Sequence, residues 1–201
     1  MRKRLVAQVS VGAVVLIGLG AWALWPGEPV VTVPDRVCAD ALPGDPVRDL
    51  LPERGEAYAE DYLWGSYSAT SVSVTWKCSL SAGGRSLHFE KFLILSEDDY
   101  SADDVSRDAA KSGNTPLSWG TEKGFIEGDT VSLYVRCKGS RGGPILLETH
   151  TSVGGGDEDH LKDLGAQEEV TALAADFTRF MTARVEYCTA VELPDDAPTV
   201  G

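Results

Sequence analysis

Strict alternation of apolar and polar residues is the clearest pattern along the chain. Between residues 72 and 80 the odd positions are serine, threonine or lysine, and the even positions are apolar: Val72, Val74, Trp76, Cys78 and Leu80. A period of two predicts a strand with one buried face. The glycine-containing turn at 81–85 is followed by residues 87–95, which predict the return strand of a hairpin. This second strand is expected to be central in a sheet, because its later half, residues 92–95, is apolar on both sides.

The same reasoning places further elements downstream. Residues 122–127 and 131–137 flank Gly128 and Asp129, which predicts a second hairpin. Residues 145–151 predict a fifth strand. Short helices are expected at 46–51, 55–63 and 97–111. A long amphipathic helix is expected near the C-terminus, opened by acids at 157–159, with an apolar stripe at a spacing of three and four: Val170, Leu173, Ala174, Phe177, Met181, Val185 and Cys188. The elements predict an α+β domain, with an antiparallel sheet of about five strands covered by helices.

The first 26 residues differ from the rest of the chain. Arg2, Lys3 and Arg4 precede residues 5–25, which carry no formal charge. This length matches the hydrocarbon core of a bilayer, and the basic cluster should stay in the cytoplasm. We interpret residues 1–26 as a basic tip and a transmembrane signal anchor. The alternative is a cleaved signal peptide, since Ala21-Trp22-Ala23 fits a signal-peptidase site. Either interpretation exports the remainder.

The exported part divides into three segments by composition. Residues 27–37 contain two prolines and predict an extended linker, residues 38–192 predict the extracytoplasmic domain, and residues 193–201 predict a flexible tail.

Four cysteines, Cys38, Cys78, Cys137 and Cys188, all follow the apolar segment, and none belongs to a CxxC pair. An even number of scattered cysteines in an exported chain predicts two disulfides rather than a metal site. Three pairings are possible. We favour Cys38–Cys78, which ties the N-terminal arm to the first strand, and Cys137–Cys188, which ties a central strand to the last helix.

The formal net charge of −13 changes the range of plausible partners. A surface this acidic repels phosphate backbones, so nucleic acid is set aside as a partner. The acidic excess also has a simpler interpretation as a determinant of solubility.

Candidate chemistry is sparse. His88 and His150 fall on predicted strands opposite the buried positions, and no HExxH, GxSxG or SxxK motif is present. Asp99, Ser101 and Asp103 have the initial spacing of a calcium loop, but Asp104 stands where the loop needs glycine, so these acids are better explained as the start of a helix. No catalytic residue, metal ligand or cofactor is predicted.

The only predicted contact surface rests on loops. Trp64 and Trp119 are expected in loops beside glycine, and Lys138 and Arg141 belong to the glycine-rich loop 138–143. Exposed tryptophan and basic side chains on loops are common in contact surfaces.

The cysteine at position 38, the WKCSL stretch around Cys78 and the late helix ending at Cys188 resemble small exported envelope and sensor domains of high-GC Gram-positive bacteria. The chain departs from them in lacking a lipid-anchored cysteine and a kinase domain. The resemblance implies a single-pass protein of the cell membrane with its C-terminal domain outside. We expect a non-enzymatic binding or interaction module whose partner is an envelope protein. A carrier of a small apolar molecule and a hydrolase are the alternatives.

Overall fold

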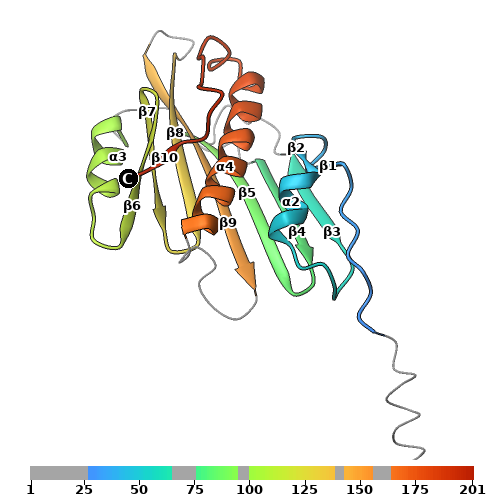
Figure 1. Cartoon of the computed structure of the whole chain (residues 1–201). Coiled ribbons are helices and arrows are strands. Elements are labelled where there is room, and N and C mark those ends of the chain that lie inside the picture. Colours follow the sequence, from blue (N-terminus) through green and yellow to red (C-terminus); the bar gives the residue numbers. More distant parts are fainter. Residues whose placement is uncertain (1–26, 65–75, 95–99, 139–142, 156–163) are drawn as a thin grey trace, which may run out of the picture.

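The computed structural model describes residues 27–64, 76–94, 100–138, 143–155 and 164–201. Their main feature is an antiparallel sheet of eight strands in the order β10-β6-β7-β8-β9-β5-β4-β3 (Figure 1). In chain order the strands are β3 (Ala59–Trp64), β4 (Trp76–Ala82), β5 (Arg85–Ile94), β6 (Asn114–Trp119), β7 (Glu122–Glu127), β8 (Thr130–Lys138), β9 (Pro144–Gly155) and β10 (Thr199–Val200). The predicted α+β class is confirmed, whereas the prediction of about five strands is wrong.

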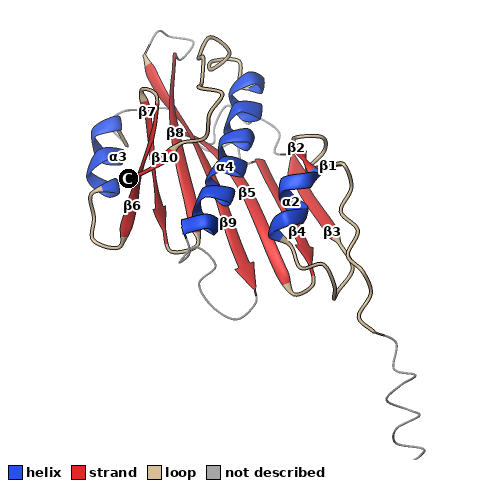
Figure 2. Ribbon diagram, viewed as in Figure 1, coloured by secondary structure: helices blue, strands red, loops and turns tan. Residues whose placement is uncertain are grey.

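Helices, drawn in blue in Figure 2, pack against this sheet. They are α2 (Gly44–Leu50), α3 (Ala102–Ala109) and α4 (Leu164–Arg184). In β8, Leu133 belongs to the core cluster that includes α4, whereas its neighbour Tyr134 packs with Val105 of α3. Because successive strand residues point to opposite faces, α4 and α3 lie on opposite sides of the sheet. We call these sides the α4 face and the α3 face.

The α4 face holds the main core. The ring of Phe177 on α4 lies 5.1 Å from the Trp76 ring and 5.5 Å from the Phe89 ring, measured between centroids. Val170, Leu173, Phe177 and Met181 are all buried, which confirms the predicted apolar stripe of the helix. The helix ends at Arg184, so Cys188 lies in the turn that follows and not on the helix itself.

Both predicted disulfides, Cys38–Cys78 and Cys137–Cys188, are confirmed. Cys38 lies in the turn between the two short strands β1 (Arg36–Val37) and β2 (Leu42–Pro43). Alpha helix α2 begins immediately after β2 at Gly44, where a Cβ atom would meet the Pro34 carbonyl oxygen at 1.8 Å. The Cys38–Cys78 bond therefore ties this compact N-terminal unit to the α4 face through β4.

The start of α3 is determined by its own sequence. The Ser101 hydroxyl accepts a hydrogen bond from the Asp104 N–H, and the Asp104 carboxylate accepts one from the Ser101 N–H at 2.9 Å. This reciprocal pair is a capping box. Asp103 and Asp104 stand in the first turn, as predicted from the favourable position of acids at a helix start.

Three strands, β3, β6 and β10, were missed because their sequences lack the expected signals. The predicted helix at 55–63 is wrong: Ala59–Trp64 form β3, an edge strand exposed on both sides, so no apolar–polar alternation marks it. No strand was predicted around Pro116, yet Pro116 lies inside β6. Proline is tolerated there because the strand beyond β6 is only the two-residue β10, near the end of the sheet.

Both segments flanking the predicted domain belong to the fold. Val31, Val33 and Val37 are buried in the core cluster, so residues 27–37 are not a free linker. At the other end, Thr199 and Val200 pair with Ser118 and Leu117 as β10, so the prediction of a flexible tail at 193–201 is wrong. The predicted anchor at 1–26 lies outside the described residues, and none of the described helices is long and apolar enough to cross a bilayer.

Candidate ligand-binding groove

A polar network occupies the α3 face where β8 and β9 run side by side. The Tyr134 hydroxyl donates to Oε1 of Glu148 over 2.7 Å, and Nε2 of His150 lies 2.8 Å from the same oxygen. The β8–β9 register places Tyr134 opposite Glu148 and Ser132 opposite His150, which brings these side chains to one face. Oε2 of Glu148 has no hydrogen-bond partner among the described residues, so this oxygen remains available to a ligand.

The charge state of this network follows from its surroundings. Burial raises the pKa of Glu148, but the hydrogen bonds from His150 and Tyr134 outweigh burial, and the net pKa lies below the ordinary value. Burial, together with the nearby Glu148 carboxylate, raises the pKa of Tyr134. Glu148 is therefore an anion at neutral pH, and the Tyr134 hydroxyl keeps its proton and acts as a donor.

A second carboxylate is held in place from α3. Oδ2 of Asp108 accepts a hydrogen bond of 2.8 Å from the Tyr100 hydroxyl, and Oδ1 lies 2.6 Å from Nζ of Lys111. The hydrogen bonds from Lys111 and Tyr100 lower the pKa of Asp108. The Tyr100 ring lies 5.6 Å from the Tyr134 ring, and the Phe125 ring stacks on Tyr134 at 5.9 Å. The rings of Tyr100 and Tyr134, each bonded to one of the two carboxylates, therefore lie beside one another, and Phe125 extends this aromatic cluster.

These groups line an open cavity of about 590 Å³ on the α3 face. Its walls combine an apolar side, formed by Ile94 and the aromatic rings, with hydroxyl groups and three carboxylates: Asp108, Glu127 and Glu148. Among the described residues that line it, His150 is the only one that can carry a positive charge. Such a mixture of apolar wall and converging polar groups is typical of a ligand site, and its volume lies in the usual range.

A smaller cavity of about 270 Å³ lies beside the first, and Tyr134 lines both. Its charged groups are of both signs. Glu122 accepts a hydrogen bond from the Arg136 N–H at 2.9 Å, and Nζ of Lys123 donates to the Ser106 hydroxyl at 2.9 Å. Glu122 also pairs with the Arg136 guanidinium at 3.8 Å, so both Glu122 and Lys123 already have partners.

The residues predicted to form a contact surface do not form one site. Trp119 lies in β6 and not in a loop, and its side chain is only 3% exposed. The C-terminal segment folds over Trp119, whose Nε1–H donates to the Asp196 carbonyl at 2.8 Å. The guanidinium of Arg179 on α4 lies 5.1 Å from the centroid of the Trp119 ring. The prediction that Trp119 is an exposed contact residue is therefore wrong.

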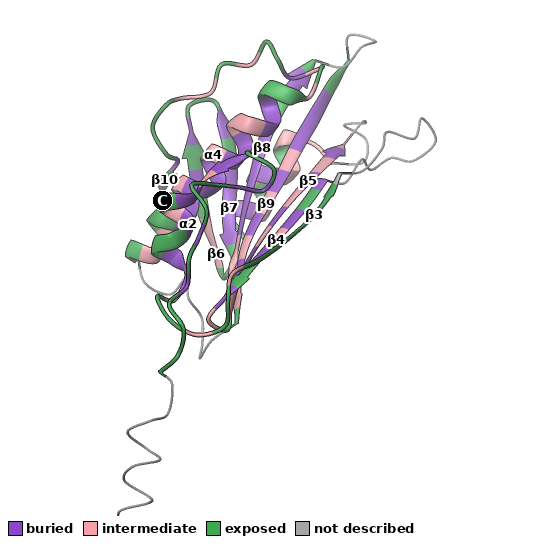
Figure 3. Ribbon diagram, turned by 90° about the vertical axis from the view of Figure 1, so that its right-hand side faces the viewer, coloured by how far each residue is buried: buried purple, intermediate pink, exposed green. Residues whose placement is uncertain are grey.

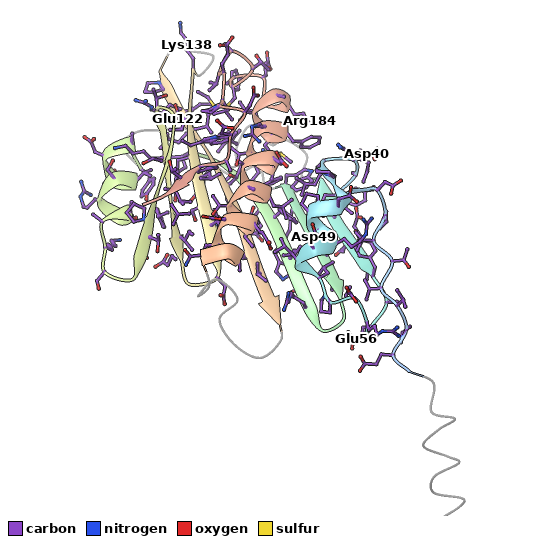
Figure 4. All side chains as sticks on the ribbon, in the orientation of Figure 1. Asp40, Asp49, Glu56, Glu122, Lys138 and Arg184 are labelled. Carbon is purple, nitrogen blue, oxygen red and sulfur yellow. A yellow bond between two sulfur atoms is a disulfide. The ribbon has the colours of Figure 1, made fainter. Side chains whose placement is uncertain are left out.

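The other three predicted residues give less information. Lys138 is exposed at the end of β8, at the upper end of the sheet in Figure 4. Trp64 ends β3, but its side chain lies outside what the structure describes, and so does all of Arg141. The predicted placement of His88 and His150 opposite the buried positions is confirmed: His88 contacts the Ser79 and Ser86 hydroxyls, both at 3.1 Å.

The groove residues were missed because they carry no motif. The alternation in β8 places Tyr134 away from the core, yet only the strand register shows that it meets Glu148. The sequence offered one signal for this groove. A tyrosine, a glutamate and a histidine occupy outward positions of two strands that were predicted to follow one another along the chain.

The chain matches no protein-family model, and no curated protein or solved structure is significantly similar to it. Its fold defines it as a two-disulfide α+β domain with a large antiparallel sheet. The argument for its function therefore rests on the groove itself.

Proposed function

We propose that this protein is a non-enzymatic binding domain, held at the outer face of the cell membrane by residues 1–26, and that the groove on the α3 face binds a cationic ligand. The predicted export signal and the two disulfides support this location. The observation that carries the binding proposal is the free Oε2 of Glu148 beside the aromatic rings of Tyr100, Phe125 and Tyr134.

The chemistry of the groove favours an ammonium or guanidinium group on an apolar body. Asp108 and Glu148 supply ionised acceptors whose positions are held by hydrogen bonds, and charge-assisted hydrogen bonds are the stronger class. The faces of the aromatic rings attract cations, and Ile94 offers apolar contact. The acidic chain as a whole would also raise the local concentration of cations.

The direct test compares two ligands that differ in one charge. N-acetyl-lysinamide and its uncharged analogue N-acetyl-norleucinamide are titrated by calorimetry into the full-length chain in mild detergent. The lysine amide is expected to bind at least about tenfold more tightly, since a hydrogen bond to a charged group contributes about 1.5–3 kcal/mol. Equal affinities for the two amides would contradict the proposal.

Variants then place the binding in the groove. Glu148→Gln should weaken the lysine amide about tenfold and leave the norleucine amide unchanged. Glu186→Gln is the matched control, because Glu186 is an exposed carboxylate in the turn after α4. If both variants lowered affinity equally, the effect would come from overall charge and not from the groove.

A hydrolase is the second candidate, and one observation favours it. Ser132 stands opposite His150 in the β8–β9 register, and His150 contacts the Glu148 carboxylate, so the three residue types of a serine-hydrolase triad share one face. Labelling by a fluorophosphonate that is lost in Ser132→Ala would support this function. Absence of labelling, together with cation binding, would favour the binding domain.

A further inference from the structure

Strand β3 is the last strand at one end of the sheet, and its outer edge is unpaired by any described strand. It pairs only with β4 among the described residues. Residues 59–63 are all exposed, and Figure 3 shows this strand in green at the margin of the sheet. Since both faces and one edge of β3 are accessible, its outer N–H and C=O groups can accept another strand.

The opposite end of the sheet is different. There the last strand, β10, has only two residues, and the Gly201 N–H that follows it donates to the Pro116 carbonyl. A short edge is one way in which proteins prevent strand addition. By contrast, β3 offers six residues without a proline. The two ends of the sheet therefore differ in their capacity to add a strand.

Apolar exposure is concentrated on the same strand. The large apolar side chains that are most exposed in the described chain are Val30, Tyr62 and Leu63, and the last two are 54% and 63% exposed. In the β3–β4 register Tyr62 lies opposite Cys78, on the α4 face, and Leu63 lies opposite Lys77, on the α3 face. An added strand would therefore find an apolar contact on each side of the sheet.

Two carboxylates precede these apolar residues. Glu60 and Asp61 are exposed, and Asp61 forms no ion pair with any described residue. Glu60 already accepts hydrogen bonds from the Ala39 N–H and the Tyr58 hydroxyl. Along β3, the edge thus presents an acid pair followed by an apolar pair, Glu60-Asp61 and then Tyr62-Leu63.

The charges decide between two possible occupants. A second copy pairing antiparallel with β3, centred on Tyr62, would place Asp61 opposite Leu63 of that copy and the two Asp61 carboxylates on a diagonal about 7–8 Å apart. Centring on Asp61 would oppose the two carboxylates directly. Both registers bring like charges together in a chain of net charge −13. A basic strand instead neutralises the acid pair.

We propose that β3 is a docking edge for an extended segment of a partner protein, which adds as a ninth strand through backbone hydrogen bonds. The segment would carry two basic residues facing Glu60 and Asp61, and two apolar residues facing Tyr62 and Leu63. For antiparallel addition its sequence runs apolar, apolar, basic, basic. This surface is separate from the groove, and its test does not depend on cation binding there.

The probe is the acetylated and amidated peptide Thr-Val-Val-Lys-Lys-Thr, added to the full-length chain in mild detergent. Binding is followed by amide hydrogen exchange, which reports on the outer N–H groups of β3. Three control peptides have the same length: one with glutamate in place of lysine, one with the residues scrambled, and one with alternate amides N-methylated. The N-methylated peptide keeps the charges but cannot form the ladder of hydrogen bonds.

We expect the basic peptide to slow exchange within β3 and the three controls to have little effect. Asp61→Asn should weaken the basic peptide about two- to fivefold at low salt, the usual range for an exposed charge pair. Asp49→Asn, an exposed carboxylate on α2 in Figure 4, should leave it unchanged. Equal protection by the N-methylated or glutamate peptide, or no protection of β3 by the basic peptide, would overturn the proposal.

Discussion

The two faces of the sheet are built on different physical principles. The α4 face is closed: a 21-residue helix covers it, aromatic rings interlock beneath the helix, and all four cysteines bond there. The α3 face carries an eight-residue helix at one side, and its remaining surface holds hydroxyls, carboxylates and histidines. Stability is concentrated on the first face, so the second can expose polar groups that are free to bind.

The largest difference between the faces should appear when one phenylalanine is removed from each. Phe177→Ala on α4 should lower the free energy of unfolding by about 3–5 kcal/mol, because it opens a cavity among fully buried rings. Phe92→Ala on the α3 face should cost about 1 kcal/mol or less, since Phe92 is only half-buried beside His150. Urea denaturation measures both. Equal losses would show that the α3 face also carries a tightly packed core.

The disulfides give the next largest effect. Replacing Cys137 and Cys188 together by serine should lower the free energy of unfolding by up to about 4 kcal/mol, because the bond closes a loop between residues 51 positions apart. The groove residues lie on the other face, so cation binding by the folded fraction should persist. Calorimetric titration of the variant with the lysine amide, corrected for the unfolded fraction, measures whether cation binding is independent of this disulfide.

Deleting one hydroxyl from each face compares their polar networks. Tyr134→Phe should cost about 1.5–3 kcal/mol, since it removes a hydrogen bond to an ionised and partly buried carboxylate. Thr178→Val removes the neutral hydroxyl pair between Thr178 and Thr149 on the α4 face and should cost about 1 kcal/mol. Thermal unfolding ranks the two variants. The reverse order would mean that the Glu148 network contributes little to the fold.

The smallest effect concerns pH. The folded-state pKa of Glu148 lies below its ordinary value of 4.5, so ionised Glu148 stabilises the fold above that pH. This contribution is lost as pH falls from about 4.5 through the folded pKa. Glu148→Gln should therefore flatten the fall of stability in this window relative to the unmodified protein. Parallel curves for the two proteins would contradict the assignment.

Sequence patterns predicted the elements whose burial is one-sided. The alternation at 76–82 is reproduced in the structure, with Trp76, Cys78 and Leu80 buried, and the spacing in the last helix placed Phe177 and Met181 in the core. Both disulfides were predicted because an even number of scattered cysteines follows the export signal, and the favoured pairing tied each end of the domain to a strand. The failures, β3, β6 and β10, are an exposed edge, a strand that contains Pro116 and a strand of two residues, none of which produces a periodic signal.

The candidate groove required the tertiary structure. Tyr134 and Glu148 are fourteen positions apart, and their hydrogen bond exists because the antiparallel register of β8 and β9 places them face to face. Trp119 shows the converse: its local sequence favours an exposed loop, yet the C-terminal segment reaches back from Asp196 and covers it.

The sequence by itself determined the class of the domain, the presence of two disulfides and the composition of its main core, since these follow from local periodicity and from residue chemistry. Only the tertiary structure decided the number of strands, the position of the tail, the groove on the α3 face and the open edge at β3. Each of these depends on which strands become neighbours, and strand pairing joins residues that no local pattern connects.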